Sequence, residues 1–388
     1  PITENPYIVG MPVRESQMFF GRQDIFEWVR ENISGKYQEQ PLLLYGERRM
    51  GKTSVLYQLQ ARPPTPQHIC LLFDLQLYGY ATTVQELLFE LASAIATHLT
   101  RNGIELAAPD WDAFEANPHR AFLAYADALD ESLGDKRIVI MMDEFGVLMD
   151  KVRNGVFDAS IFDYLRGITQ RSRRFTFLFT GAYEVRRMQQ DFSSILFNMP
   201  KVRKISYLTE AEATDLIVEP VKGLIEYHPL VIQRIRNVTA CHPYFIQYIC
   251  DELVKLAQAE QRNYIELTDV DAVIQDVVRD ATGNIENSIY NDLSEAEKLV
   301  LAALAHVTDE VRVFVLLGDI ANMLERRRLG MSREEILQAL RALRERDLVT
   351  ETRIGQQLRY SFRMGLVRMW LRENEMLLRL AQQQERET

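Results

Sequence analysis

The sequence has few cysteines, no long apolar run and no signal of secretion. Its three cysteines, Cys70, Cys241 and Cys250, are odd in number and lack the C-x-x-C spacing of a metal site. We therefore expect buried thiols in a reducing cytoplasm. No apolar run approaches the ~20 residues of a membrane-spanning helix, so we expect no membrane association. The chain begins PITENPYIVG, without Met and without the basic and apolar regions of a signal peptide, so we interpret it as processed, tagged or excised from a longer chain.

An excess of basic charge is also missing. The formal net charge is −10 and the pI is about 5.3. This argues against a protein whose whole surface binds nucleic acid, because phosphate binding needs a basic surface. Apolar residues make up 47% and charged residues 26% of the chain, as in ordinary globular proteins. A chain of 388 residues is too long for one core, so we expect two or three domains.

The first half of the chain alternates short apolar runs with helical patterns. This alternation predicts a parallel sheet covered by helices on both faces. We place this α/β domain at 1–207, with 101–119 as a loop insertion. The predicted strands are 41–46, 68–78, 137–145, 175–181 and 201–208, and the predicted helices are 52–61, 82–100, 121–133, 160–174 and 184–190.

Two further patterns follow. Residues 208–290 show only helical spacing, with capping boxes at Thr209 and, more weakly, at Thr268, and predict a helical subdomain. Residues 291–388 predict a winged helix-turn-helix: three helices, two strands around Gly355 and a closing helix. The predicted helices are 209–221, 229–239, 243–260 and 267–281 in the first region, and 294–307, 316–328, 332–349 and 363–374 in the second.

The segment GERRMGKTS, residues 46–54, matches the phosphate-binding loop G-x-x-x-x-G-K-[ST] in full. Gly46 and Gly51 allow the backbone to wrap with its N–H groups inward, and the helix that follows adds its positive N-terminal end. Lys52 would reach the β- and γ-phosphates, and Thr53 would offer its hydroxyl to Mg²⁺. The predicted nucleotide-binding residues of the loop are Gly46, Arg48, Arg49, Met50, Gly51, Lys52, Thr53 and Ser54.

Acidic residues complete the predicted site. Asp143 follows the apolar run IVIMM, at the strand end where open α/β sheets bind ligands, and we expect it to hold Mg²⁺ together with Thr53. Glu144 would polarise the attacking water. Thr180 ends the next predicted strand, and we expect it close to the γ-phosphate as a third catalytic residue beside Glu144 and Lys52.

Four segments resemble the AAA+-related STAND NTPases, in particular the clade of archaeal-type ATPases. They are FFGRQDIFEWV (19–29), GERRMGKTSVL (46–56), MMDEF (141–145) and VTACHPYFIQYICDEL (238–253). The resemblance implies that the segment before the first strand packs against the base, and that the His-Pro segment closes over the nucleotide. It thereby nominates Ile8, Val9, Phe20, Gly21, Arg22, His242 and Pro243 as further nucleotide-binding residues.

The sequence departs from that family at two points. Ala240 and Cys241 stand where relatives carry two glycines, so we expect the lid turn to differ. No arginine is singled out as the finger of a ring-forming ATPase, although Arg48 and Arg49 lie inside the phosphate-binding loop. At least one of these two could bridge phosphate to another domain. The other finger candidates are Arg171, Arg173, Arg174, Arg186, Arg187 and Arg203.

The predicted winged helix is close to neutral, with 14 Lys/Arg and 13 Asp/Glu between residues 293 and 375. Its third helix opens with Ser332 followed by Glu334 and Glu335, which suits a helix N-terminus but not a phosphate backbone. We therefore favour a winged helix that faces protein or senses nucleotide over a DNA reader.

The leading prediction is a cytoplasmic, slowly hydrolysing STAND-type ATPase switch. ATP or ADP with Mg²⁺ would control docking of the lid and winged helix, and hence contact with a protein partner or self-association. The alternative is a DNA-associated AAA+ ATPase resembling archaeal origin-binding initiators. A third and weaker class is a scaffold that binds nucleotide without turnover, and GTP in place of ATP stays open.

Overall fold

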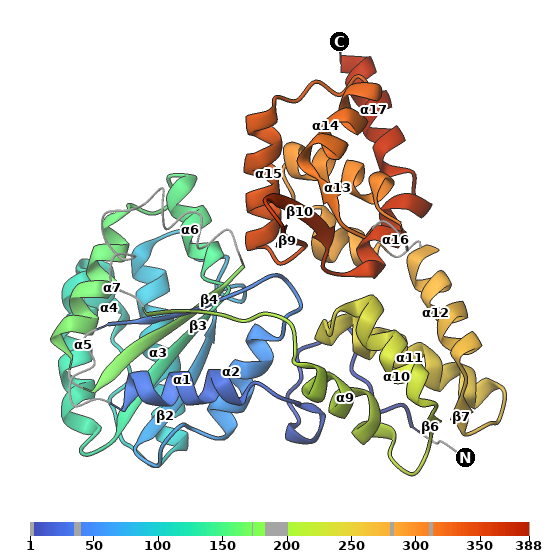
Figure 1. Cartoon of the computed structure of the whole chain (residues 1–388). Coiled ribbons are helices and arrows are strands. Elements are labelled where there is room, and N and C mark those ends of the chain that lie inside the picture. Colours follow the sequence, from blue (N-terminus) through green and yellow to red (C-terminus); the bar gives the residue numbers. More distant parts are fainter. Residues whose placement is uncertain are drawn as a thin grey trace.

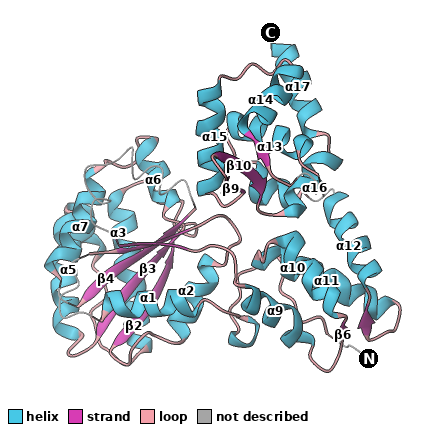
Figure 2. Cartoon of the chain, in the orientation of Figure 1, coloured by secondary structure: helices cyan, strands magenta, loops and turns pink. Residues whose placement is uncertain are grey.

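The chain folds into an α/β core, a helical lid and a C-terminal domain of helices with a small sheet (Figures 1 and 2). The computed structural model describes residues 4–34, 40–172, 174–182, 201–279, 283–309 and 313–387, with no side-chain detail for 383–387. In Figure 1 the core lies at the left, the lid at the lower right and the C-terminal domain above them.

The core contains a five-stranded parallel sheet in the order β2-β3-β4-β1-β5. Side chains alternate between its two faces: Ile138 and Ile140 pack on one side, Val139 and Met141 on the other. Burial on both faces explains the near-continuous apolar runs seen in the sequence. The strands are β1 Leu42–Tyr45, β2 His68–Asp74, β3 Arg137–Asp143, β4 Phe175–Gly181 and β5 Lys201–Lys204.

Helices cover both faces of this sheet, as predicted. One face is covered by α1 Gln23–Ile33 and α2 Lys52–Ala61. The other is covered by α3 Val84–Arg101, α5 Pro118–Ser132, α6 Gly146–Arg153 and α7 Ser160–Arg171. The predicted loop 101–119 contains a short helix, α4 Trp111–Ala116, whose Phe114 is buried against the α3 side chain Phe89. The helix predicted at 184–190 lies outside the described residues.

The lid consists of α9 Glu210–Val218, α10 Pro229–Thr239, α11 Pro243–Ala259 and α12 Leu267–Arg279. The capping box of Thr209 with Glu212 is present at the start of α9. The box predicted at Thr268 is wrong, because α12 already begins at Leu267 and Asp269 instead accepts from the backbone of Glu266 at 2.7 Å. Two-residue strands, β6 Glu226–Tyr227 and β7 Tyr264–Ile265, pair within the lid.

The C-terminal domain has the element order of a winged helix. Its helices are α13 Glu295–Val307, α14 Leu317–Arg326 and α15 Arg333–Glu345, and its sheet has the order β8-β10-β9. The wing is formed by β9 Val349–Ile354 and β10 Gln357–Phe362, with β8 Val315–Leu316 beside β10. Helices α16 Gly365–Glu373 and α17 Met376–Glu387 close the domain. Ser332 and Glu335 form the predicted capping box of α15.

One apolar core runs through the lid and the winged helix. It also includes Tyr7, Val13 and Met18 from the N-terminal segment, which we call the strap (residues 4–18). The predicted α/β domain 1–207 therefore begins with a strap that packs on the lid and not on the sheet. The lid and the winged helix therefore meet through closely packed apolar side chains.

The three cysteines are buried and not disulfide-bonded, as predicted. Among the described residues, no helix is long and apolar enough to cross a membrane.

Candidate nucleotide site

The loop between β1 and α2 has the shape of a phosphate cradle. Gly51 has a φ of +87°, and a Cβ on Gly46 would lie 2.2 Å from the carbonyl oxygen of Ile205 on the neighbouring strand segment. No other residue type fits at Gly46 without displacing that backbone. The Nζ of Lys52 donates to the carbonyl oxygens of Gly46 and Glu47, each at 2.9 Å, so the lysine is folded back over its own loop.

Carboxylates gather where β2 and β3 end. Asp143 is 2% exposed and lies opposite Asp74 in the strand register. The hydroxyl of Thr180 donates to Asp143 Oδ1, and the backbone N–H of Glu144 donates to the same oxygen at 3.1 Å. Burial raises the pKa of Glu144, while the charges of Lys52 and Arg48 act in the opposite direction. A carboxylate with a raised pKa beside a lysine is a suitable group for accepting a proton from water.

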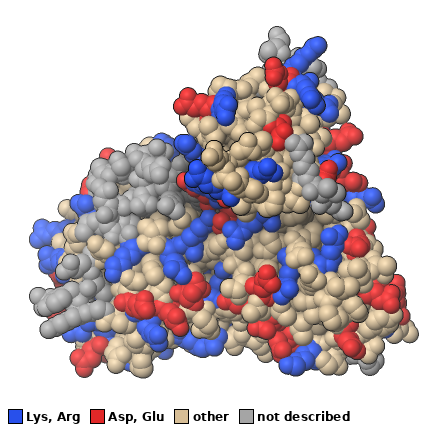
Figure 3. All heavy atoms as spheres, viewed as in Figure 1, with Lys and Arg blue, Asp and Glu red and all other residues tan. Residues whose placement is uncertain are grey.

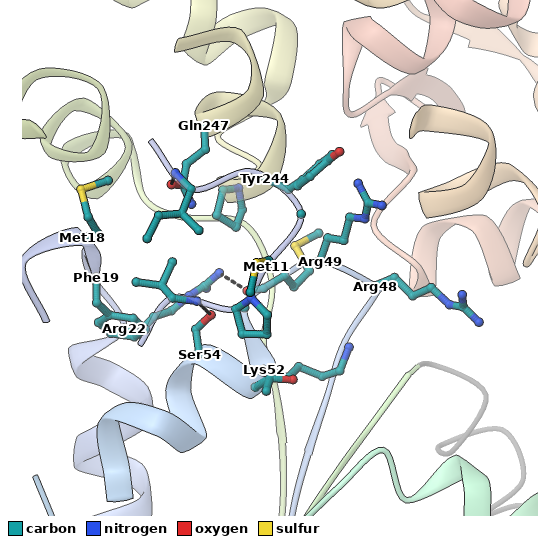
Figure 4. A pocket seen from close by; sticks show the side chains of 18 of the residues that line it. Met11, Met18, Phe19, Arg22, Arg48, Arg49, Lys52, Ser54, Tyr244 and Gln247 are labelled. Atoms are coloured by element: carbon teal, nitrogen blue, oxygen red, sulfur yellow. Dashed lines mark hydrogen bonds between the residues drawn. The ribbon is translucent and has the colours of Figure 1, made fainter. Parts of the chain in front are cut away.

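A cavity of about 520 Å³ lies between the cradle, the strap and the lid (Figure 4). Twelve of the predicted site residues line it: Ile8, Phe20, Arg22, Arg48, Arg49, Met50, Gly51, Lys52, Thr53, Ser54, Glu144 and Pro243. The wall beside the strap is apolar, with Met18 and Phe19 from the strap region and Leu216 from α9. An apolar wall beside a cationic loop suits a ligand with a flat base at one end and phosphates at the other.

The other six predicted residues do not line this cavity. Asp143 and Thr180 lie behind Glu144, and the Thr180 hydroxyl holds Asp143 instead of reaching toward the cradle. In this structure Thr180 therefore positions Asp143, and its role at a γ-phosphate stays a prediction. The lining also does not include Val9, Gly21, Gly46 and His242.

The FFGR segment forms a joint between the core and the lid. Gly21 has a φ of +75°, and a Cβ there would collide with the carboxylate of Glu212. Glu212 accepts from the backbone N–H of Arg22 at 2.9 Å, and the Arg22 side chain donates to the carbonyl oxygen of Met50 at 2.9 Å. Burial lowers the pKa of Arg22 to about 10, so this guanidinium stays charged. The segment thus links the lid residue Glu212 to the cradle residue Met50.

The strap is fixed between α2 and α11. The N–H of Ile8 donates to Gln247 Oε1 at 3.0 Å, and the N–H of Val13 donates to the hydroxyl of Ser54 at 2.9 Å. Sequence reasoning missed Gln247 and the strap residues Met11, Pro12 and Val13, all of which line the cavity. Their polar partners lie 41 and 239 residues away, so no local pattern could have revealed them.

The lid turn places His242 beneath the cavity. Ala240 and Cys241 have φ values of 49° and 64°, the left-handed backbone that glycine would favour. His242 is 1% exposed and lies edge-on to Tyr207 and Phe245. Burial lowers its pKa to about 3, so the imidazole is neutral at physiological pH. Five non-glycine residues in this region have a positive φ: Arg22, Arg49, Glu144, Ala240 and Cys241. The first three line the cavity, and such strained backbone is common at functional sites.

Three consecutive residues of the cradle contact the C-terminal half of the chain. Arg48 pairs with Asp292 at 2.7 Å. Arg49 stacks on the ring of Tyr244, 4.1 Å from its centroid. Glu47 Oε2 lies 3.3 Å from Arg346 Nη1, and Arg346 Nε lies 3.4 Å from Glu297 Oε1. The loop that would hold phosphate is therefore also the place where the winged helix meets the core.

Of the remaining arginine candidates, Arg171 pairs with Asp127 and Arg203 with Asp24, both on the surface. Arg174 follows α7 and lies outside the cavity lining. Arg173, Arg186 and Arg187 lie outside the described residues. Nothing in the described part of the chain places these arginines at the cavity.

The cavity has the donors for a metal held jointly with phosphate. In the described part of the chain, no cluster of three or more His, Cys, Asp or Glu side chains could hold a metal by itself. Thr53 lines the cavity, and Asp143 is a buried hard oxygen donor next to Glu144, which also lines it. This set fits Mg²⁺, which takes one or two protein oxygens and completes its shell with phosphate and water.

No protein-family model and no curated protein matches this sequence. Solved structures do. The Aeropyrum pernix ORC2 protein in its ADPNP–ADP complexes superposes with a TM-score of 0.62 at 14% identity, covering 98% of this chain and 97% of that chain. Its ADP form superposes with a TM-score of 0.50 at 13% identity, covering 97% and 96%. The chain therefore shares the fold of this ORC2 protein over nearly its whole length: a parallel-sheet α/β core, a helical lid and a C-terminal winged helix in this order.

Proposed function

We propose that this chain is an ATPase that binds ATP with Mg²⁺ between the core, the strap and the lid. The observation that carries the proposal is the cavity itself. It joins a complete phosphate cradle, a partly buried glutamate of raised pKa and an apolar wall supplied by two other segments. The fold shared with the ORC2 protein, whose structures are an ADPNP–ADP complex and an ADP form, supports the same conclusion.

Each residue of the site has a proposed role that follows from its position. The Lys52 ammonium would turn from the carbonyl oxygens of its own loop to the phosphates, which offer a stronger, charged partner. Thr53 and Asp143 would hold Mg²⁺, with Thr180 fixing the orientation of Asp143. Glu144 would accept a proton from the attacking water. Turnover should be slow, because apart from Arg48 and Arg49 no described arginine among the finger candidates lies at the cavity.

Binding and hydrolysis can be tested separately. A fluorescent ATP should bind the wild type and fail to bind Lys52→Ala, with ADP and GTP measured beside it. Lys136→Ala is the matched control, because Lys136 also donates to a backbone carbonyl, that of Pro66. It lies just before β3, at the amino-terminal ends of the strands, whereas the cradle follows the carboxyl end of β1. Equal binding by wild type and Lys52→Ala would refute the site.

Glu144→Gln should retain ATP and release no phosphate, since an amide cannot accept the proton of the attacking water. Phosphate release that is the same in Glu144→Gln and wild type would instead support a scaffold without turnover. The STAND reading remains a prediction from four sequence segments. The whole-chain likeness to an ORC2 protein supports the initiator-like alternative better.

The alternative function is binding of duplex DNA through the winged helix. The observation that favours it is the exposed face of α15, where a shallow groove is lined by Arg333, Glu334, Leu337, Gln338 and Arg341. Arg353 is exposed on the wing nearby in the same domain. Glu334 and Glu335 lie in the first turn of α15 and limit the basic surface.

Salt dependence tests the DNA hypothesis. If α15 and the wing bind phosphates, the double variant Arg341→Ala/Arg353→Ala should lower the slope of log affinity against log salt by about 2. A dissociation constant far below micromolar and a steep loss with salt would support this function. Weak binding that is insensitive to both substitutions would leave the winged helix as a protein-facing domain.

A further inference from the structure

The winged helix is attached to the core by charged and polar side chains. Figure 3 shows basic and acidic groups gathered in the hollow where the C-terminal domain meets the rest of the molecule. On one side of this junction, Asp347 pairs with Lys204 at 2.7 Å and accepts a hydrogen bond from the hydroxyl of Ser206 at 2.7 Å. The cradle residues Glu47 and Arg48 form the other side. Polar junctions of this kind can exchange partners without opening an apolar core.

Arg48 lies between Asp292 and the nucleotide cavity. Its guanidinium Nε pairs with Asp292 Oδ2 at 2.7 Å, just before the cap of α13, while the residue itself lines the nucleotide cavity. Its side chain is 59% exposed, so it has room to change rotamer. Figure 4 shows Arg48 directed outward, away from the other labelled side chains, whereas Arg49 lies against Tyr244. Arg48 and Glu144 line the same cavity.

Because the proposed function puts a γ-phosphate beside Glu144, we propose that Arg48 is the residue by which this site distinguishes a nucleoside triphosphate from a diphosphate. In the structure Arg48 is held by Asp292. A γ-phosphate offers it a more highly charged partner, and Arg48 cannot serve both at once. Binding of ATP, but not of ADP, therefore competes with the Arg48–Asp292 pair.

The competition reaches the winged helix through Asp292. The carbonyl oxygen of Asp292 accepts from Arg346 Nη2 at 2.9 Å, and Ser294, two residues later, caps α13. Loss of Arg48 removes the ion pair that joins Asp292 to the cradle and loosens the segment that leads into α13. Reciprocity requires that whatever weakens the Arg48–Asp292 pair strengthens ATP binding relative to ADP binding.

The test measures dissociation constants of full-length protein for a non-hydrolysable ATP analogue and for ADP. Asp292→Asn keeps the shape of the side chain and removes its charge, so the affinity ratio should shift toward the triphosphate by about two- to fivefold, the range for a partly exposed pair. Arg48→Ala should shift the ratio the other way by about tenfold, because a charge-assisted bond to phosphate is lost. In the Arg48→Ala background, Asp292→Asn should have no further effect.

Asp347→Asn is the matched control. It removes the charge from an acid that also joins the winged helix to the core, but at Lys204 and not at the cradle. It should leave the triphosphate-to-diphosphate ratio unchanged. An equal shift in Asp347→Asn and Asp292→Asn would overturn the proposal and indicate general loosening. An unchanged ratio in Asp292→Asn would also overturn it.

Hydrogen exchange gives a second readout. Backbone amides around the start of α13 should exchange faster with the triphosphate analogue than with ADP, and this difference should vanish in Arg48→Ala. An identical exchange pattern with the two nucleotides would contradict the proposal. The failure of the proposed function looks different: neither nucleotide would then bind, and Lys52→Ala would match the wild type.

Discussion

Replacing Arg346 with Met tests how firmly the cradle holds the winged helix. The Arg346 side chain is only 4% exposed, and its guanidinium lies between Glu47, 9% exposed, and Glu297, 4% exposed. Methionine keeps the length and apolar character of the stem but leaves two buried carboxylates without their shared cation. Removing one partner of a buried ion pair costs about 3–5 kcal/mol, because the remaining charge is desolvated and uncompensated.

Trp370 provides the assay. It is 5% exposed in α16 and packs against Tyr290, so its fluorescence reports the C-terminal domain. The other two tryptophans, Trp28 and Trp111, can be changed to Phe so that Trp370 is the single emitter. Urea unfolding of this background with and without Arg346→Met should then show the loss directly.

Arg344→Met is the control, since Arg344 lies on the same helix and pairs with Glu351, but its side chain is 46% exposed. It should cost less than about 1 kcal/mol, as solvent-exposed pairs do. Glu47→Gln combined with Arg346→Met should show a coupling energy of about 1–3 kcal/mol. A loss below about 1 kcal/mol in Arg346→Met, or one equal to that of Arg344→Met, would refute the view that this cluster docks the winged helix.

Three further predictions concern the cradle and the lid. Gly46→Ala should destabilise the core by at least about 1–3 kcal/mol and abolish nucleotide binding, since its Cβ would lie 2.2 Å from the carbonyl oxygen of Ile205; unchanged urea unfolding would contradict this. His242 has a pKa of about 3 in the folded protein, below the ~6.5 of an unfolded histidine, so the unfolded state binds more protons between these values. Stability should therefore fall by about 2 kcal/mol from pH 7 to pH 5, and His242→Phe should lose this part of the pH dependence when unfolding is followed at both values. Ala240→Gly should raise the free energy of unfolding by up to about 1 kcal/mol, because the φ of 49° is left-handed and glycine adopts it without strain; a lower stability would show that the turn is not strained.

Much of the fold could be predicted from the sequence, because it depends on short-range patterns. The predicted helix 52–61 coincides with α2, and the capping boxes at Thr209 and Ser332 form because all their atoms lie within one turn. Four of the five core strands could be found because burial on both faces leaves an apolar run, whereas the edge strand β5 is polar and partly exposed. The short helix α4 was missed because Phe114 is buried against Phe89 of α3, a contact outside its local sequence window.

The site residues likewise divide into those that local motifs reveal and those that depend on tertiary contacts. The cradle Gly46–Ser54 and the pair Asp143 and Glu144 follow from local motifs, because a phosphate needs consecutive backbone N–H groups and a metal needs an acid at a strand end. Thr180 was assigned to the γ-phosphate because it ends the neighbouring strand. In the structure its hydroxyl holds Asp143, an interaction that its place in the sequence does not reveal, and its role at a γ-phosphate stays a prediction.

By itself, the sequence determined an α/β core with a complete phosphate cradle, followed by a helical lid and a winged helix. Only the tertiary structure decided what the odd residues of the cradle do. Glu47 meets Arg346 at a separation of 299 residues, and Arg48 meets Asp292 from a similarly distant part of the chain. A charged side chain carries no local record of its partner, because charge pairs form wherever packing brings helices together. The joining of nucleotide loop and winged helix is therefore a property of the folded molecule.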